Sequence, residues 1–109
     1  MGFACWDLGR GDSSRIGIAG VRSGLEMLLI EWRPGETVQA IDVLHNDISI
    51  GRCMSGEPSN NFSRCQIYLP PGTISSDLIL RYIGDKQILS NKMNNSALFK
   101  RIQLIEKKD

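Results

Sequence analysis

Short apolar segments, separated by turn-forming residues, recur along the whole chain. Most of them are about five to nine residues long and rich in Ile, Val, Leu and Tyr, which is too short for typical helices and typical of β-strands. The breaks between them contain Gly, Pro, Asn and Asp, which favour turns. The pattern predicts eight strands, at residues 15–19, 25–32, 37–44, 48–52, 64–69, 77–83, 86–89 and 98–105.

Within these segments apolar and polar residues alternate, as expected for strands with one buried face. The segment at 25–32 is different, because Leu28 and Ile30 make its second face apolar as well, which predicts a central strand. The residues that we expect on buried faces elsewhere are Ile16, Ile18, Ile41, Val43, Cys65, Ile67, Leu69, Leu78, Leu80, Tyr82, Leu98, Ile102 and Leu104.

Two turn sequences divide the strands. Asn46 and Asp47 both tolerate a positive φ and suit a two-residue hairpin turn. The Pro-Pro-Gly sequence at 70–72 ends the preceding strand, because proline cannot donate a hydrogen bond to the ladder. Eight short strands with such turns predict a single all-β domain over residues 1–109, an antiparallel β-sandwich of jelly-roll type, with residues 106–109 as a solvent-exposed tail.

The net charge of the chain is close to zero. Lys and Arg number 13 and Asp and Glu number 12, which gives a formal charge of +1 at pH 7. This balance excludes the strongly basic surface of a protein that binds nucleic-acid polymers, and it offers little attraction to an anionic membrane. The sequence has neither an apolar run of about 20 residues nor a signal peptide, so we expect no membrane insertion and a cytoplasmic location.

The chain has three cysteines, Cys5, Cys53 and Cys65, and one histidine, His45. Their number and spacing do not suit a structural zinc site. Cys53 and Cys65 could form a disulfide across a hairpin, which would stabilise the fold by about 3 kcal/mol. The alternative, which the sequence favours, is that these thiols are free and act as small buried apolar residues in a reducing compartment.

Three stretches of the chain carry a resemblance to known modules. Residues 43–51 read Val-Leu-His-Asn-Asp-Ile-Ser-Ile-Gly, a Leu-Pro-Pro-Gly step at 69–72 precedes the alternating strand 78–82, and 97–104 form a closing strand. Together they resemble jelly-roll accessory modules. The opening of the chain, Gly2-Phe3 with Trp6 and residues 15–18, also resembles the start of one group of these, the β-sandwich modules appended to bacterial glycosyltransferases and other enzymes of surface polysaccharides. Carbohydrate-binding modules of the jelly-roll type share the layout. The resemblance implies a non-catalytic module that is carbohydrate-binding or accessory to polysaccharide-processing enzymes, with an oligosaccharide or another small molecule as its partner.

The candidate ligand-binding residues are aromatic, basic or part of a turn. Trp32 ends an apolar strand just before a turn, so it could lie at the rim of the sandwich and stack on a sugar. The alternative, which the sequence favours, is a tryptophan at the edge of the core. Arg52, Arg64 and Arg81 could line one polar surface, or simply belong to a solvated sheet face. The candidates are Trp6, Trp32, His45, Asn46, Asp47, Arg81 and Tyr82.

No arrangement of residues predicts catalysis. The chain lacks a G-x-S-x-G nucleophile motif and His45 is better explained as a polar turn residue, so we expect no enzyme activity. We also expect no cofactor other than a possible structural calcium ion, which needs roughly six to eight oxygen ligands. Asp7, Asp12 and the loop at 57–61 could supply some of them.

A second hypothesis belongs to another class. A neutral sandwich of 109 residues could be a small stand-alone phage or bacterial protein that forms homo-oligomers and sequesters a small molecule such as a nucleotide signal. Oligomers would bury the two-faced strand at 25–32 and create pockets between copies. The molecular mass in solution separates the two hypotheses, because a strict monomer argues against the second.

Overall fold

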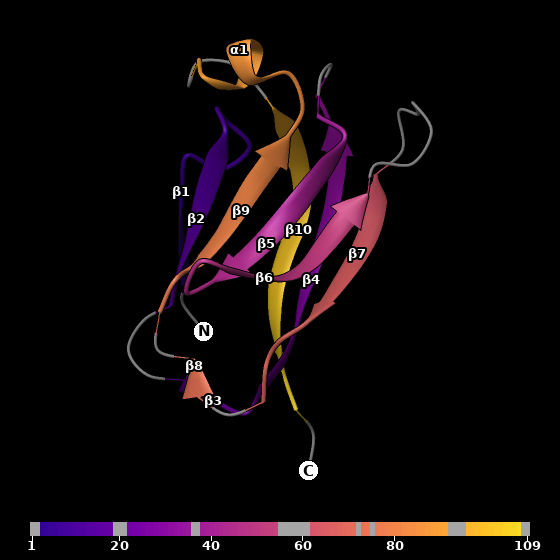
Figure 1. Cartoon of the computed structure of the whole chain (residues 1–109). Helices are drawn as coiled ribbons and strands as arrows, with labels where there is room; N and C mark the ends of the chain where they lie inside the picture. The colour runs from indigo at the N-terminus through magenta and orange to yellow at the C-terminus, as the bar shows by residue number, and fades with distance from the viewer. Residues whose placement is uncertain are drawn as a thin grey trace.

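Most of the chain folds into two stacked antiparallel sheets (Figure 1). The computed structural model describes residues 3–18, 22–35, 38–54, 62–71, 73–74, 76–91 and 96–107. Its elements in chain order are β1 (Phe3–Trp6), β2 (Ser13–Ile18), β3 (Arg22–Ser23), β4 (Leu25–Pro34), β5 (Ala40–His45), β6 (Ile48–Met54), β7 (Ser63–Tyr68), β8 (Thr73–Ile74), β9 (Leu78–Ile83), α1 (Lys86–Leu89) and β10 (Ala97–Glu106). Eight of these strands form the sandwich, and β3 and β8 make a small separate ladder.

The strand order of the two sheets is that of a jelly roll with one departure. The larger sheet is ordered β1-β2-β9-β5-β6 and the smaller one β10-β4-β7, so strands from the two halves of the chain lie next to each other in each sheet. The departure is β1, which pairs with β2 from Phe3↔Ile18 to Trp6↔Arg15 and not with the last strand. The prediction of an all-β, jelly-roll-like sandwich is confirmed.

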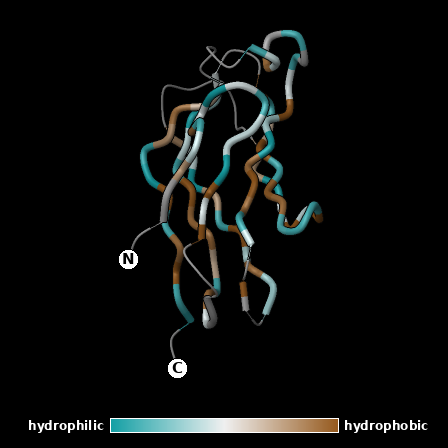
Figure 2. Tube along the Cα trace, turned by 90° about the vertical axis from the view of Figure 1, so that its left-hand side faces the viewer, coloured by the Kyte–Doolittle hydropathy of each residue, from teal (hydrophilic) through white to brown (hydrophobic). Residues whose placement is uncertain are grey.

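The core lies between the sheets and is centred on β4, which is the middle strand of the smaller sheet. Leu28, Ile30 and Trp32 point into the core, and Leu29 on the opposite face is also buried, as a two-faced central strand predicts. Figure 2 shows hydrophobic and hydrophilic residues alternating along the strands. The other buried core residues are Ile16, Leu25, Val38, Ile41, Val43, Cys53, Ile67, Leu69, Ile74, Leu78, Leu80, Tyr82, Leu89, Ala97 and Leu104.

Both predicted turn sequences end strands as expected. Asn46 and Asp47 connect β5 to β6 with φ angles of 52° and 64°, the left-handed conformation that a type I′ hairpin turn requires. β7 ends at Tyr68. The next residue, Leu69, still donates its amide to the Glu26 carbonyl at 2.8 Å, and the two prolines follow it. The two-residue turn places His45 opposite Ile48 and so sets the register of β5 against β6.

Residues 86–89, predicted as a strand, form the single helical turn α1. The reason is the preceding residue, Asp85. Its side chain accepts a hydrogen bond from the Gln87 amide at 2.9 Å, and its carbonyl accepts one from the Leu89 amide at 2.9 Å. An aspartate at this position satisfies the free amides at the start of a helix, which favours helix over strand. Leu89 is thereby turned into the core.

The last strand, β10, differs from the prediction at both ends. A β-bulge lies between Phe99 and Arg101 and shifts the alternation by one residue. Leu98 therefore points outward and is 42% exposed, and Phe99 packs against the core in its place. At the other end β10 includes Glu106, and the Lys107 amide donates to the Gly24 carbonyl at 2.7 Å, so the expected tail is in part a strand.

A disulfide joins Cys53 of β6 to Cys65 of β7. The two strands belong to opposite sheets, so the bond is a link between the layers of the sandwich and not a bridge within one hairpin. Of the two alternatives left by the sequence, the favoured one, free thiols at these positions, is wrong. Cys5 is the free cysteine of the described residues.

Candidate binding site

The outward face of the larger sheet carries a row of polar residues across four strands. The register aligns Ser13 of β2 with Arg81 of β9, Arg81 with Asp42 of β5, and Asp42 with Arg52 of β6. Alternate residues of β9 face the core, so Ile79 and Ile83 flank Arg81 on its outward side. The next outward-facing row lies two residues farther along β2, where Arg15 pairs with Trp6 of β1.

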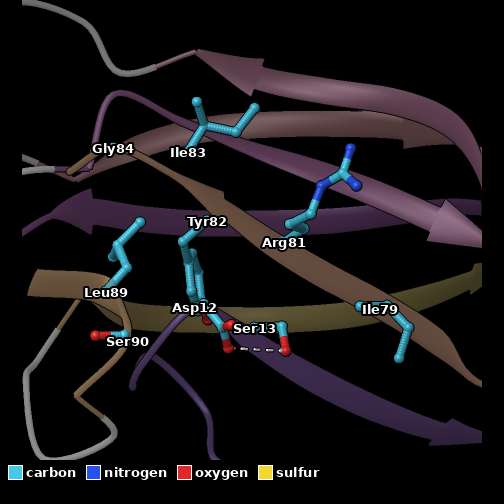
Figure 3. A pocket seen from close by; sticks show the side chains of 9 residues that line it. All are labelled: Asp12, Ser13, Ile79, Arg81, Tyr82, Ile83, Gly84, Leu89 and Ser90. Atoms are coloured by element: carbon cyan, nitrogen blue, oxygen red, sulfur yellow. Dashed lines mark hydrogen bonds between the residues drawn. The ribbon is translucent and has the colours of Figure 1, made fainter. Parts of the chain in front are cut away.

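A hollow of about 650 Å³ opens on this face near the end of β9 (Figure 3). Its volume lies within the range of roughly 300–1,000 Å³ found for small-molecule sites. The helical turn α1 forms one wall, and the residues just before and at the start of β2 form another. The lining residues are Asp12, Ser13, Ile79, Arg81, Tyr82, Ile83, Gly84, Leu89 and Ser90.

Arg81 is held in place by a nearly buried carboxylate. Its Nη2 donates to Asp42 Oδ2 at 2.7 Å, Ser49 Oγ donates to Asp42 Oδ1 at 2.6 Å, and Arg52 Nε lies 3.9 Å from the same Oδ1. The Asp42 side chain is 2% exposed, whereas those of Arg81 and Arg52 are 55% and 52% exposed. The arginines therefore lie above the carboxylate and keep part of each guanidinium in solvent.

These contacts keep Asp42 ionised. Burial alone would raise the pKa of the carboxyl group, but hydrogen bonds from Ser49 and Arg81 and the positive charges of Arg52 and Arg81 outweigh it. The pKa of Asp42 therefore lies below its ordinary value. The cluster as a whole has two positive charges and one negative charge.

A buried hydrogen-bond network fixes the wall that precedes β2. The hydroxyls of Tyr82 and Ser14 are 2.6 Å apart, and both accept the Gly9 amide at 3.0 Å. Ser14 in turn donates to the Asp7 carbonyl at 2.7 Å, which leaves Tyr82 as the donor to Ser14. The Tyr82 amide also donates to the Asp12 carbonyl at 2.9 Å. Asp12 is thus positioned by the backbone of β9.

Trp6 lies on the same face, in the row next to that of Ser13 and Arg81. Its side chain is 44% exposed, and the Arg15 guanidinium is 4.0 Å from the centre of its ring. Gly17 allows the ring to lie close to the sheet, because a Cβ there would be 2.2 Å from the ring atom Cζ3. Arg15 also pairs with Asp77 at 3.5 Å. The indole is therefore held in a fixed orientation, partly exposed, with the Arg15 guanidinium over one face of its ring.

The structure separates the residues that the sequence singled out. Arg81 and Tyr82 line the hollow, although Tyr82 is buried and its hydroxyl is engaged inside. His45, Asn46 and Asp47 do not line the hollow. His45 pairs with Leu78 at the start of β9, and Asn46 and Asp47 form the hairpin turn next to it. Gly84 and α1 lie beyond the other end of β9.

Of the two positions that the sequence left open for Trp32, the structure shows the core and not the rim, so this candidate ligand-binding residue does not reach the surface. It is 0% exposed, because it continues the core-facing series of Leu28 and Ile30 along β4. Arg64 also lies away from the site, on β7 of the other sheet.

Several residues of the hollow were not anticipated. Asp12 and Ser13 reach it through the pairing of β2 with β9, and Leu89 and Ser90 reach it through the helical turn. These contacts join residues about 70 positions apart, which no local pattern can reveal. The one local signal was Asp85, whose capping role predicts the helical turn that carries Leu89.

Other kinds of site are not found in the described residues. No group of three or more His, Cys, Asp or Glu side chains in this part of the chain could hold a metal ion, and the 57–61 loop expected to help bind calcium lies outside it. No helix in the same part is long and apolar enough to cross a membrane. Comparison of the chain with models of known protein families and with curated proteins finds no match.

Proposed function

We propose that this protein is a non-catalytic carbohydrate-binding module and that the hollow on the outward face of β9 receives the sugar. The observation that carries the proposal is the lining of the hollow, where apolar side chains lie beside oriented polar ones. Ile79, Ile83 and Leu89 supply apolar surface, and Asp12 and Arg81 supply an acceptor and a donor.

This combination matches the chemistry of a sugar ring. A pyranose has C–H groups that pack on apolar or aromatic surface, and neighbouring hydroxyls that each donate and accept hydrogen bonds. A carboxylate accepts from such hydroxyls and a guanidinium donates to them. Because Arg81 is fixed by Asp42, little side-chain freedom is lost when it binds. Trp6 on the same face is 44% exposed and has the Arg15 guanidinium over one face of its ring, so a longer chain would contact this pair and not an open ring face.

The test is a thermal-shift screen against neutral and acidic oligosaccharides and linear and cyclic nucleotides, followed by calorimetric titration. A ligand at 100 times its dissociation constant stabilises the folded state by about 2.7 kcal/mol, which raises the melting temperature by several degrees. Ser90→Trp should fill the hollow and abolish binding. Gln66→Trp, on the exposed outward face of β7, is the matched control and should bind normally. Binding that survives Ser90→Trp places the sugar elsewhere.

A second candidate, homo-oligomerisation, is favoured by the outward face of the smaller sheet. Here the register puts Ile105, Met27 and Tyr68 in one apolar row, in which Tyr68 is 67% exposed. A second copy covering this row would form the oligomer of a small-molecule-sequestering protein. Light scattering tests it: a dimer that Tyr68→Lys converts to a monomer supports this candidate, and a monomeric wild type contradicts it.

A further inference from the structure

We propose that the sugar taken by this site is acidic, and that its carboxylate or phosphate is held between Arg81 and Arg52. The inference rests on the proposed function and names the class of saccharide. It starts from the cluster on the outward face, in which two arginines share the single carboxylate of Asp42.

The charge of this cluster is not balanced. Asp42 neutralises one guanidinium, so one positive charge remains on a surface where both arginines are more than half exposed. Within the described part of the chain, Asp42 is the acidic residue paired with either arginine. A carboxylate or phosphate can accept hydrogen bonds from two guanidinium groups at once, which gives both affinity and orientation.

The other acidic residues of this face lie on different sides of it. Asp77 is paired with Arg15. Asp12 and the Arg81 guanidinium lie on opposite sides of β9, and the Arg81 side chain points away from Asp12 in Figure 3. We therefore assign the anionic group of the ligand to the Arg52 side of Arg81. The neutral part of the ring, with its hydroxyls, occupies the hollow beside Asp12 and Ser13.

The two arginines are oriented for this role by Asp42, whose carboxylate pairs with both of them and is itself held by the Ser49 hydroxyl. The Arg81 guanidinium uses Nη2 for Asp42, and among the described residues this is the one hydrogen bond that it donates. A guanidinium carries five N–H donors in a fixed plane. Asp42 is accordingly a positioning residue, which acts on the ligand through Arg81.

The experiment compares matched probes on the intact chain by calorimetric titration. The probes are cellobiose, the corresponding disaccharide with one uronic acid, a hexose phosphate and inorganic phosphate. We expect the acidic sugar to bind at least tenfold more tightly than cellobiose at low salt, and the difference to shrink as salt screens the charges. The uronate and phosphate arms show which anionic group the site prefers.

Charge-removing variants locate the effect. Arg52→Gln and Arg81→Gln should each reduce the preference for the acidic sugar by about tenfold, because each removes a charge-assisted contact. Arg64→Gln, an exposed arginine on the other sheet, is the control and should change nothing. Asp42→Asn should weaken the binding of both sugars, through loss of orientation, while thermal unfolding reports any loss of stability separately.

The outcomes separate the two proposals. Equal affinity for cellobiose and its acidic counterpart overturns the acidic-sugar inference and leaves the carbohydrate proposal standing. If inorganic phosphate binds in an Arg81-dependent way and no sugar does, the anion site stands and the carbohydrate proposal fails. If no probe binds, both are overturned.

Discussion

Cys53 and Cys65 join the two sheets of the sandwich through a disulfide, with their Cα atoms 5.8 Å apart. Cys53 is on β6 and Cys65 on β7, each an edge strand of its own sheet, and 12 positions separate them in the chain. The bond therefore closes one side of the sandwich, at two edge strands between which the described residues form no backbone ladder. The same two strands also meet at Gly51 and Ile67, where the Ile67 side chain packs in the space that a Cβ of Gly51 would occupy.

Reduction of this disulfide should lower the free energy of unfolding by about 3 kcal/mol, because the unfolded chain then gains the freedom of a short closed loop. Denaturant unfolding of the oxidised protein and of the Cys53→Ser, Cys65→Ser double variant measures the difference. Cys5→Ser is the control and should keep the effect of reductant unchanged, since Cys5 forms no disulfide. A wild type that is equally stable with and without reductant would contradict the assigned bond.

Two glycines with similar backbone angles should respond very differently to alanine. Gly9 and Gly24 have φ angles of 75° and 78°, so a side chain is strained at either. At Gly9 a Cβ would also lie 2.2 Å from the Ala97 carbonyl oxygen, whereas at Gly24 nothing lies within 4 Å. We expect Gly24→Ala to cost about 1 kcal/mol and Gly9→Ala several times more. Equal losses in chemical denaturation would show that the Gly9 loop can move away.

Replacement of the two tryptophans by alanine should lower the stability of the fold by very different amounts. Trp32 is fully buried, so Trp32→Ala should cost about 3–5 kcal/mol of stability, as other large-to-small changes in cores do. Trp6→Ala should cost much less, because nearly half of that side chain is already in water. Fluorescence checks the assignment: acrylamide should quench the emission of the Trp32→Phe variant, which retains Trp6, more readily than that of Trp6→Phe.

The fold could be predicted further than the site. Alternation located the main strands and correctly oriented Leu78, Leu80 and Tyr82, because a half-buried strand imposes a period of two. It failed where the period breaks, at the bulge that turns Leu98 outward, and it missed β1, whose sequence Phe-Ala-Cys-Trp has no alternation.

The hollow depends on long-range register, which a single sequence does not contain. Arg81 was singled out as a basic residue on a strand. Its partners Asp42 and Ser13 become visible only when β9 is placed between β5 and β2. The position of Trp32 stayed open between rim and core for a related reason: its face is set by the sheet that covers it, and apolar residues occur on both faces of β4.

Tyr82 should make the protein sensitive to alkaline pH. Burial raises the pKa of its hydroxyl to about 12, against the lowering effect of hydrogen bonds with Ser14 and Gly9. A pKa raised on folding means that the protonated form stabilises the protein, fully at pH values below the unfolded pKa of about 10. This contribution is lost as pH rises from about 10 to 12.

The variant Tyr82→Phe lacks that hydroxyl and should lose the corresponding part of the alkaline decline. At neutral pH it should also be less stable by about 1–3 kcal/mol, because Ser14 and the Gly9 amide lose a buried partner. Urea unfolding at several pH values measures both effects. Tyr68→Phe, at an exposed position, is the control and should follow the wild-type profile.

Asp42 should govern stability at the acid end of the pH range. Its pKa is lowered in the folded state, so its contribution is present above the unfolded value of about 3.9 and is lost as pH falls through the folded pKa. Asp42→Asn keeps the shape of the side chain but leaves Arg81 and Arg52 without their counter-charge. The variant should therefore be less stable at pH 7, and the difference from wild type should narrow below about pH 4. Since Arg81 is more than half exposed, we expect a loss at pH 7 of only about 1–2 kcal/mol. A difference that stays constant from pH 7 to pH 2 would mean that Asp42 acts through hydrogen bonds that asparagine cannot make, and not through its charge.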